Sequence, residues 1–257
     1  MSTDIPHLEL GHALITMIEP EPATITEYND WYERDHSLSG VLTGPGAFAF
    51  RRFVATRDLK ALRSPADSPV ARPLAEGSFI ALYWFERDQL SAHAEWGFPE
   101  TARLYGLGRM RTDRRHVSTA YYDLVGVTGR GAKPVPAELA LAHPYDALVM
   151  IWTSSPVGHE DAAAGLRASL VDETSPIGNV VTFREAPVEP MPGTIIGETS
   201  VDPTTVLAHC AFVNGAIDQA LVARINAAIA AVGLTPLLVA PFVPTIPGTD
   251  TYLDQLW

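Results

Sequence analysis

Runs of β-branched, aromatic and aliphatic residues alternate with amphipathic stretches along the whole chain. Short apolar runs bounded by turn residues predict buried strands, and apolar residues at helical spacing predict helices. In the first half the pattern predicts strands over 12–18, 47–55, 79–85 and 118–127 and helices over 24–36 and 88–105. In the second half it predicts strands over 147–153, 179–184, 205–213 and 237–242 and helices over 160–171 and 217–232. The order β-α-β-β-α-β therefore occurs twice.

This repeated order predicts an α+β fold of two tandem ferredoxin-like units, over 1–128 and 137–257, joined by a Gly- and Pro-containing linker. No repeat of individual residues accompanies it. We expect each unit to form a four-stranded antiparallel sheet with two helices on one face. The two bare faces would then pack sheet to sheet as an intrachain dimeric α/β barrel. The Pro-rich tail over 241–257 ends in apolar residues, so we expect it to dock on the barrel or on a neighbouring subunit.

Several local signals set the expected ends of these elements. Thr24 and Glu27 have the spacing of a capping box, which predicts a helix that starts there and runs to about His36. The stretch over 57–77 has three prolines and mixed charge, which indicates a surface loop. Pro99 should kink or restart the second helix. Gly233 is expected to cap the helix over 217–232.

Composition excludes several classes of function. The 257 residues are 47% hydrophobic with a formal net charge of −12 and only two lysines, so a nucleic-acid partner is not expected. No apolar run approaches the roughly 20 residues of a membrane span, and residues 1–9 do not resemble a secretory signal. We therefore expect a cytoplasmic protein. The single Cys210 lies in an apolar strand, which indicates inert core.

The most informative segment for chemistry is the first predicted helix. Tyr28, Trp31, Tyr32 and Asp35 share one helical face, with His36 at its edge. In the last turn, the helix dipole and the neighbouring carboxylate would favour protonated His36 and tune its pKa near neutrality. The alternative is that His36 only caps the helix end while the aromatic residues pack on the sheet.

The sequence W-Y-x-x-x-H that closes this helix, in a β-α-β-β-α-β unit, resembles the EthD and related dimeric α/β-barrel proteins. The resemblance covers about the first 125 residues, and the second half is similar only in element order. The family pattern more often has two residues between Tyr and His and a Glu before the His, whereas here three residues intervene and Asp35 precedes His36.

The resemblance implies a cavity between sheet and helices that holds a small, largely apolar substrate. His36 would be the acid or base, supported by Asp35, while Tyr28 or Tyr32 would stabilise an enolate oxygen and Trp31 would wall the pocket.

Other side chains could complete the pocket, and each has a plainer interpretation. His93 and Trp96 share a face of the second helix, but they could equally be a solvent-facing histidine and a core tryptophan. Trp84 would bind substrate only if it faces the cavity. Tyr121 and Tyr122 point to opposite faces of a strand, so at most one lines the site. Arg111 belongs to the basic cluster over 109–116, which would attract an anionic substrate or simply pair with acidic neighbours in a solvated loop.

The sequence thus predicts a cofactor-independent enzyme that performs a cyclisation, dehydration or isomerisation on an aromatic, polyketide-derived or other apolar carbonyl compound. One alternative is a cofactor-free monooxygenase of a phenol. Another is a non-catalytic haem-binding or carrier protein with His36 or His93 as axial ligand. No metal site, nucleotide motif or cofactor is expected. One pocket per chain is predicted, in the first half, because the helix over 160–171 lacks an acid or base on its apolar face. The sequence is compatible with a homodimer.

Overall fold

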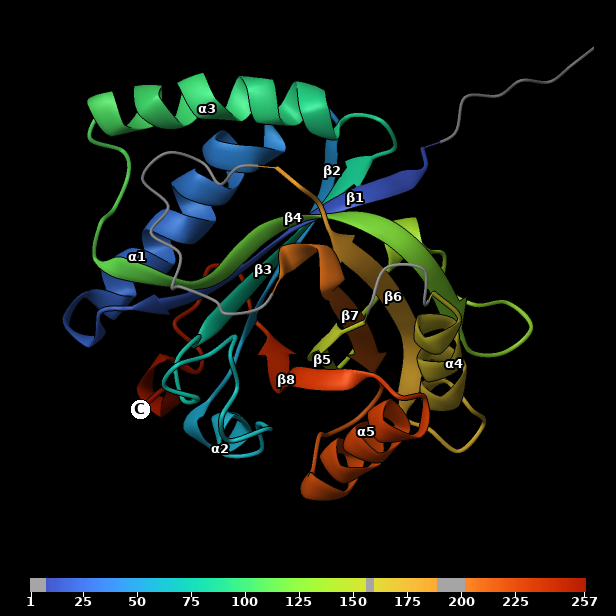
Figure 1. Cartoon of the computed structure of the whole chain (residues 1–257). Helices are drawn as coiled ribbons and strands as arrows, with labels where there is room; N and C mark the ends of the chain where they lie inside the picture. The colour runs from blue at the N-terminus through green and yellow to red at the C-terminus, as the bar shows by residue number, and fades with distance from the viewer. Residues whose placement is uncertain (1–7, 156–159, 189–201) are drawn as a thin grey trace, which may run out of the picture.

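The computed structural model describes residues 8–155, 160–188 and 202–257 (Figure 1). The first half contains β1 (Leu10–Pro20), α1 (Ile25–Trp31), β2 (Ala47–Val54), α2 (Arg57–Lys60), β3 (Phe79–Glu86), α3 (Leu90–Gly106) and β4 (Arg114–Gly129). The second half contains β5 (Ala147–Ser154), α4 (Glu160–Leu170), β6 (Ile177–Glu185), β7 (Val206–Val213), α5 (Gln219–Ala231) and β8 (Thr235–Pro244). Apart from the short α2, this is the element order that the sequence predicts.

The eight strands form one closed antiparallel barrel in the order β1-β3-β2-β8-β5-β7-β6-β4. Each half thus contributes four neighbouring strands, β4-β1-β3-β2 and β8-β5-β7-β6. Hydrogen-bonded pairs β2–β8 and β4–β6 join the halves, so the sheets are continuous at both seams rather than only packed on each other. The β4–β6 seam is long, whereas the β2–β8 seam is limited to the pairs Phe53–Pro244 and Val54–Val243. The architecture fits a ferredoxin-like dimeric α/β-barrel type of fold.

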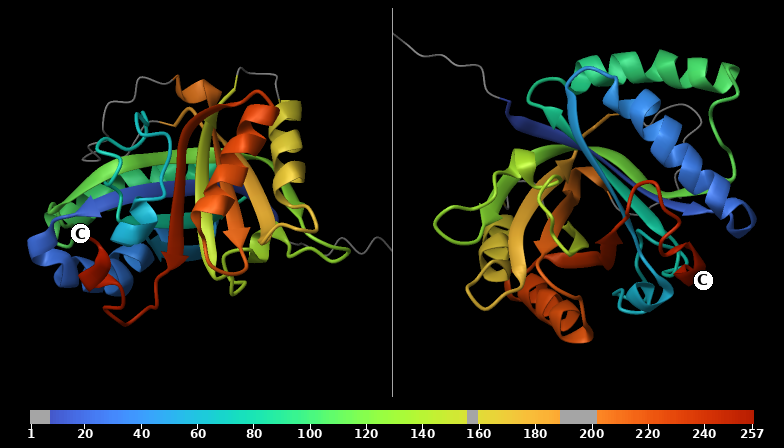
Figure 2. Two further views of the ribbon diagram at one scale, coloured as in Figure 1. Left: turned by 90° about the horizontal axis from the view of Figure 1, so that it is seen from below. Right: turned by 180° about the vertical axis from the view of Figure 1, so that it is seen from behind.

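The alternation of side chains along each strand divides the core into three layers. On β3, Ile80, Leu82 and Trp84 point into the barrel, whereas Tyr83 and Phe85 point outward. Helices α1 and α3 lie outside the first half of the barrel, and α4 and α5 lie outside the second (Figures 1 and 2). Each helix pair closes an outer layer against the sheet. The second outer layer is largely aliphatic, and the first is rich in aromatic and polar groups.

The first helix differs from its predicted form at both ends. The Thr24 hydroxyl donates to Asp113 and makes no capping hydrogen bond, so the capping box is wrong. The helix does not end at His36. It continues as two π-helical turns over Tyr32–His36 and Leu38–Leu42. Helix α3 likewise runs through Pro99 without a break.

The predicted surface loop over 57–77 is partly buried. Lys60 and Arg63 are each only 6% exposed. The Arg63 guanidinium donates to the carbonyl oxygens of Leu74, Glu76 and Gly77, which explains how a charged group can occupy this position. The Lys60 ammonium donates to the Ser78 hydroxyl and to a carbonyl near the C-terminus.

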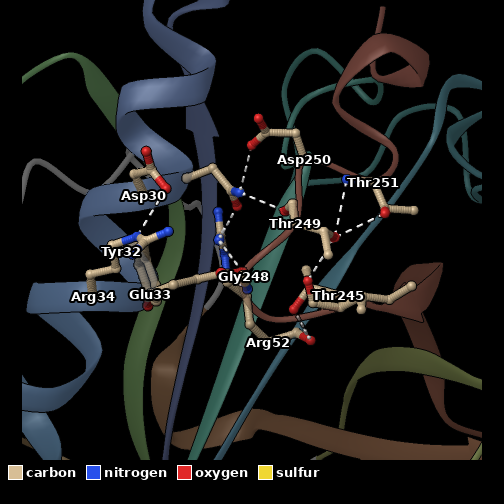
Figure 3. A network of polar contacts seen from close by, with 12 residues as sticks. Asp30, Tyr32, Glu33, Arg34, Arg52, Thr245, Gly248, Thr249, Asp250 and Thr251 are labelled. Carbon is tan, nitrogen blue, oxygen red and sulfur yellow. Dashed lines mark hydrogen bonds and ion pairs between the residues drawn. The ribbon is translucent and has the colours of Figure 1, made fainter.

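The C-terminal tail docks, as the sequence predicts. Leu256 is buried in the outer layer of the first half, and its carbonyl oxygen accepts from Lys60 at 2.9 Å. The indole of Trp257 donates to Glu19 at 2.8 Å. The loop before it, over 245–251, packs on α1 (Figure 3). Gly233 follows α5 with a positive φ of 76°, as expected for its cap.

Among the described residues, no helix combines the length and the apolar character that crossing a membrane requires.

Candidate functional site

Helix α1 and the π-helical turn after it bring the predicted aromatic face onto the outer surface of the sheet. Tyr28 and Tyr32 are buried, and Trp31 is half-buried. The His36 ring stacks on Trp31 with centroids 4.4 Å apart and planes 16° apart, and it meets Tyr32 edge-on at 5.3 Å. The indole of Trp31 donates to the Arg109 carbonyl oxygen at 2.7 Å, which fixes its orientation.

His36 is held neutral, the opposite of the protonated state that the sequence suggested. Its pKa is lowered to about 3, first by burial and then by the positive charge of Arg114. The dipole argument does not apply, because the helical backbone continues past this residue. Nδ1 is buried without a hydrogen-bond partner. Residue 40 has no Cβ, and one placed there would stand 2.9 Å from this nitrogen. Gly40 therefore packs closely against Nδ1, which is buried and accepts no hydrogen bond.

The charge of Asp35 acts to raise the pKa of His36, as predicted, but it is outweighed by burial and by Arg114. The Asp35 carboxylate forms an ion pair with the Arg109 guanidinium and accepts from the Ser39 hydroxyl at 2.7 Å. The hydrogen bonds from Arg109 lower the pKa of this carboxyl group. No hydrogen bond between Asp35 and His36 is present.

Arg52 on β2 lies at the centre of the layer and was missed by sequence reasoning. It is 2% exposed, and its guanidinium lies over the rings of Phe79, Tyr32 and Tyr28 at 3.9, 4.6 and 5.3 Å. Nη1 donates to Asn29 at 2.7 Å and lies 3.7 Å from Glu33, as part of the network in Figure 3. Nε and Nη2 are buried without partners. The sequence signal that could have identified Arg52 is an arginine inside an otherwise apolar predicted strand.

The phenols of the layer are neutral donors. The Tyr32 and Tyr83 hydroxyls lie 3.0 Å apart, and burial raises the pKa of both groups. The Tyr28 hydroxyl is buried with no hydrogen-bond partner, and burial raises its pKa as well. A buried phenol that lacks a partner can donate to an oxygen atom of a bound molecule.

A second group of candidates meets around Phe85. His93 is fully buried rather than solvent-facing, and it packs on Phe85 at 4.3 Å, on Trp96 at 5.3 Å and on Tyr121 at 6.2 Å. Burial lowers the pKa of His93 to about 4. Nδ1 lies 3.1 Å from the Pro45 carbonyl oxygen, whereas Nε2 and the Tyr121 hydroxyl lack partners. These side chains share the outer layer with Tyr28 and Tyr32, but no direct contact joins them to His36.

Three of the predicted positions have a structural role. Trp84 faces the barrel interior and donates to the Ala137 carbonyl oxygen at 3.1 Å, so it is core. Tyr121 and Tyr122 face opposite sides as predicted, with Tyr122 inside the barrel. Arg111 pairs with Asp113. Cys210 is buried in the barrel interior.

A pocket of about 530 Å³ lies away from these residues, beside Leu10 and Leu124. The charged side chains that line this pocket already form ion pairs or hydrogen bonds within the protein. Arg87 pairs with Glu9 at 2.7 Å, and Glu138 accepts from the Leu10 amide. The unpartnered buried polar atoms near His36 therefore mark a stronger candidate site than this pocket.

The residues present fit neither a metal nor a haem iron. In the described part of the chain, no cluster of three or more His, Cys, Asp and Glu side chains could hold a metal ion. His36 Nδ1 is buried and packs against Gly40, where a Cβ would stand 2.9 Å away. His93 is enclosed by side chains, and its Cε1 lies 2.6 Å from where a Cβ at Gly44 would stand. Neither imidazole faces the wide opening that a porphyrin needs.

Comparisons with known proteins identify the fold. No family model and no curated protein matches the sequence. The chain is similar to the solved structure of a chlorite dismutase-like protein, with a TM-score of 0.52, 10% identity and coverage of 97% of this chain and 100% of that one. It is also similar to an anthrone oxidase-like protein, with a TM-score of 0.51, 10% identity and coverage of 94% and 95%. These likenesses show the fold alone, a ferredoxin-like dimeric α/β-barrel type; the resemblance to EthD stays a prediction.

Proposed function

We propose that this protein is a cofactor-independent enzyme that removes a proton from a small aromatic or otherwise apolar carbonyl compound. The observation that carries the proposal is the neutral His36, stacked on Trp31 with its Nδ1 buried and unpartnered. The neutral imidazole is available to accept a proton, and a substrate that brings negative charge near Arg114 would raise the low pKa of His36, so we assign His36 as the general base.

The surroundings of His36 suit the anion that this step creates. The guanidinium groups of Arg52 and Arg114 supply positive charge, and the Tyr28 hydroxyl is free to donate to an enolate or phenolate oxygen. Trp31 and Tyr32 provide aromatic contact for the substrate ring. Cyclisation, dehydration or isomerisation can each follow from the same enolate.

We further propose that the two halves are separate units, over 1–128 and 137–257, and that only the first carries a site. In the second outer layer, His209 is fully buried and both its nitrogens lie 2.9 Å from hydroxyl groups, those of Thr153 and Thr182. It has no free nitrogen to act as a base. The second unit then serves to complete the barrel.

Monooxygenation is a second candidate. The same positive charge around His36 would stabilise a phenolate, which is the electron-rich form of a phenol that reacts with dioxygen. The similarity to an anthrone oxidase-like protein makes anthrone a rational probe. Oxygen uptake with anthrone that depends on His36 would select this reaction over isomerisation or cyclisation.

The test uses exchange of acidic C–H protons with D₂O, followed by NMR for anthrone and 2-tetralone. His36→Gln should slow the enzyme-dependent exchange by about 10²–10⁴-fold, whereas His143→Gln, at a histidine outside the site, should not. An effect of less than about threefold for His36→Gln would remove the catalytic role. A Soret absorption band in purified protein that is lost in His36→Gln would replace the proposal by haem binding.

A further inference from the structure

The basic cluster contains one arginine that differs from its neighbours. Four arginines lie between residues 109 and 115, and three of them form ion pairs with carboxylates. The pairs are Arg109–Asp35, Arg111–Asp113 and Arg115–Glu76. Arg114 has no carboxylate within ion-pair distance in the described part of the chain; its Nη1 contacts only the Arg111 carbonyl oxygen. The simple interpretation of a solvated, paired cluster therefore holds for three residues and fails for Arg114.

A bulge in β4 explains why Arg114 faces the site. Opposite β1, Ser118 pairs with Met17 and His116 with Ile18, so Val117 is the extra residue. Val117 packs into the barrel interior, whereas Ile18 and Tyr121 face the helix layer. Because a bulge shifts the alternation by one residue, Arg114 and His116 face α1, and Arg115 does not.

The Arg114 guanidinium lies over the ring of Trp31, the same ring on which the proposed base His36 stacks. It is 4.7 Å from the centre of the Trp31 ring, and the residue is half-buried. Its positive charge lowers the pKa of His36 and also acts on Tyr28 and Tyr32. The nearby His116 is neutral, since burial lowers its pKa to about 3. A guanidinium that lies over an aromatic ring and has no carboxylate partner among the described residues can pair with an anion.

We propose that the ligand of this site is an aromatic carboxylate whose carboxylate group pairs with Arg114 while its ring packs among the aromatic side chains of α1. The inference rests on the proposed function and names its substrate class. A carboxylate fits better than a phosphate. The guanidinium fork matches one carboxylate in bidentate geometry. Among the described residues around α1, Arg52 and Arg109 already lie near carboxylates, so Arg114 offers a single positive charge, which suits a monoanion.

Pairing would also strengthen the base. After burial, the charge of Arg114 is the largest cause that keeps the pKa of His36 low. A bound carboxylate offsets that charge, so His36 accepts a proton more readily with the acid bound than with a neutral analogue. The carboxylate would thus serve both recognition and activation.

The test compares two probes of the same shape by calorimetry, 2-naphthoate and its neutral amide, 2-naphthamide. The wild-type protein should bind the carboxylate at least about tenfold more tightly. Arg114→Gln should abolish this preference while leaving 2-naphthamide affinity within about threefold, which also shows that the variant is folded. Arg111→Gln, at a paired arginine of the same cluster, should keep the preference. Arg114→Lys should keep part of it, because the charge remains.

Three results would overturn the inference. The first is a wild-type protein that binds neither probe at about 1 mM or binds both with equal affinity. The second is an Arg114→Gln variant that loses affinity for both probes to the same extent. The third is an Arg111→Gln variant that loses the carboxylate preference as Arg114→Gln does. Failure of the proposed function differs from these. In that case the Arg114-dependent preference persists in calorimetry, but proton exchange is unaffected by His36→Gln.

Discussion

Asp35 and His36 are consecutive in sequence but lie in different electrostatic environments. The Asp35 carboxylate pairs with Arg109, whereas the His36 ring stacks on Trp31 and its pKa is lowered by burial and by the positive charge of Arg114. The pair is therefore not a carboxylate–histidine dyad, and this distinction can be measured.

The first prediction compares the two neighbours. Asp35→Asn should change proton-exchange rates by less than about threefold, because the carboxylate makes no hydrogen bond to the base, whereas His36→Gln should lower them by about 10²–10⁴-fold. NMR exchange of anthrone protons measures both. Equal losses in the two variants would show that Asp35 orients His36 after all.

The second prediction concerns Gly40, which packs against His36 Nδ1 and leaves no room for a Cβ. In Gly40→Ala the new methyl group would stand 2.9 Å from Nδ1, so the ring must shift. Alanine is favoured over glycine in a helix by about 1 kcal/mol, which offsets part of the strain. We expect at least about a tenfold loss of exchange activity with little change in unfolding free energy. The control is Gly165→Ala in α4, far from the site. Unchanged activity in Gly40→Ala would show that Nδ1 is not the acceptor.

The third prediction concerns the network between α1 and the C-terminal segment (Figure 3). Buried Asn29 donates to Thr249 and Asp250 and accepts from Arg52. Asn29→Ala should lower the unfolding free energy by about 2–3 kcal/mol, because it removes these bonds and deprives a buried guanidinium of a partner.

Its matched control is the next residue. Asp30 makes an exposed i,i+4 ion pair with Arg34, so Asp30→Ala should cost less than about 0.5 kcal/mol. Urea unfolding measures both variants. Similar values for Asn29→Ala and Asp30→Ala would mean that the network contributes little stability.

The fourth prediction concerns pH. His93 and His209 are fully buried, and burial lowers their pKa values to about 4 and about 3. Below the ordinary histidine pKa of about 6.5, the unfolded chain binds protons at these histidines and the folded chain does not. The free energy of unfolding therefore falls as the pH falls from about 6.5 to 4. Each histidine contributes up to about 1.4 kcal/mol per pH unit. Glu185 acts in the opposite direction, since burial raises its pKa to about 7.

Urea unfolding at several pH values between 4 and 7 measures this slope. His93→Phe should reduce the slope by about one proton, whatever it does to absolute stability. A slope identical to that of the wild-type protein would show that His93 is protonated in the folded state or does not titrate differently on unfolding.

Local patterns were sufficient for the arrangement of elements. The apolar runs over 12–18, 79–85 and 147–153 correspond to β1, β3 and β5, because a strand buried on both faces needs little beyond continuous apolar character. Helix ends were less predictable. Thr24 and Glu27 have capping-box spacing, but the Thr24 hydroxyl donates its hydrogen bond to Asp113, which is distant in sequence. The continuation past His36 depends on packing against the sheet and on Gly40, which no propensity indicates.

The sequence by itself determined the order of elements, the position of the aromatic face on α1 and the presence of a histidine beside it, because these follow from composition and periodicity within a single segment. Only the tertiary structure decided the charge state of His36, the partner of Asp35, the central place of Arg52 and the separation of Arg114 from its paired neighbours. Each of these depends on burial and on charges brought together from distant strands, and one-residue bulges decide which side chains face the site.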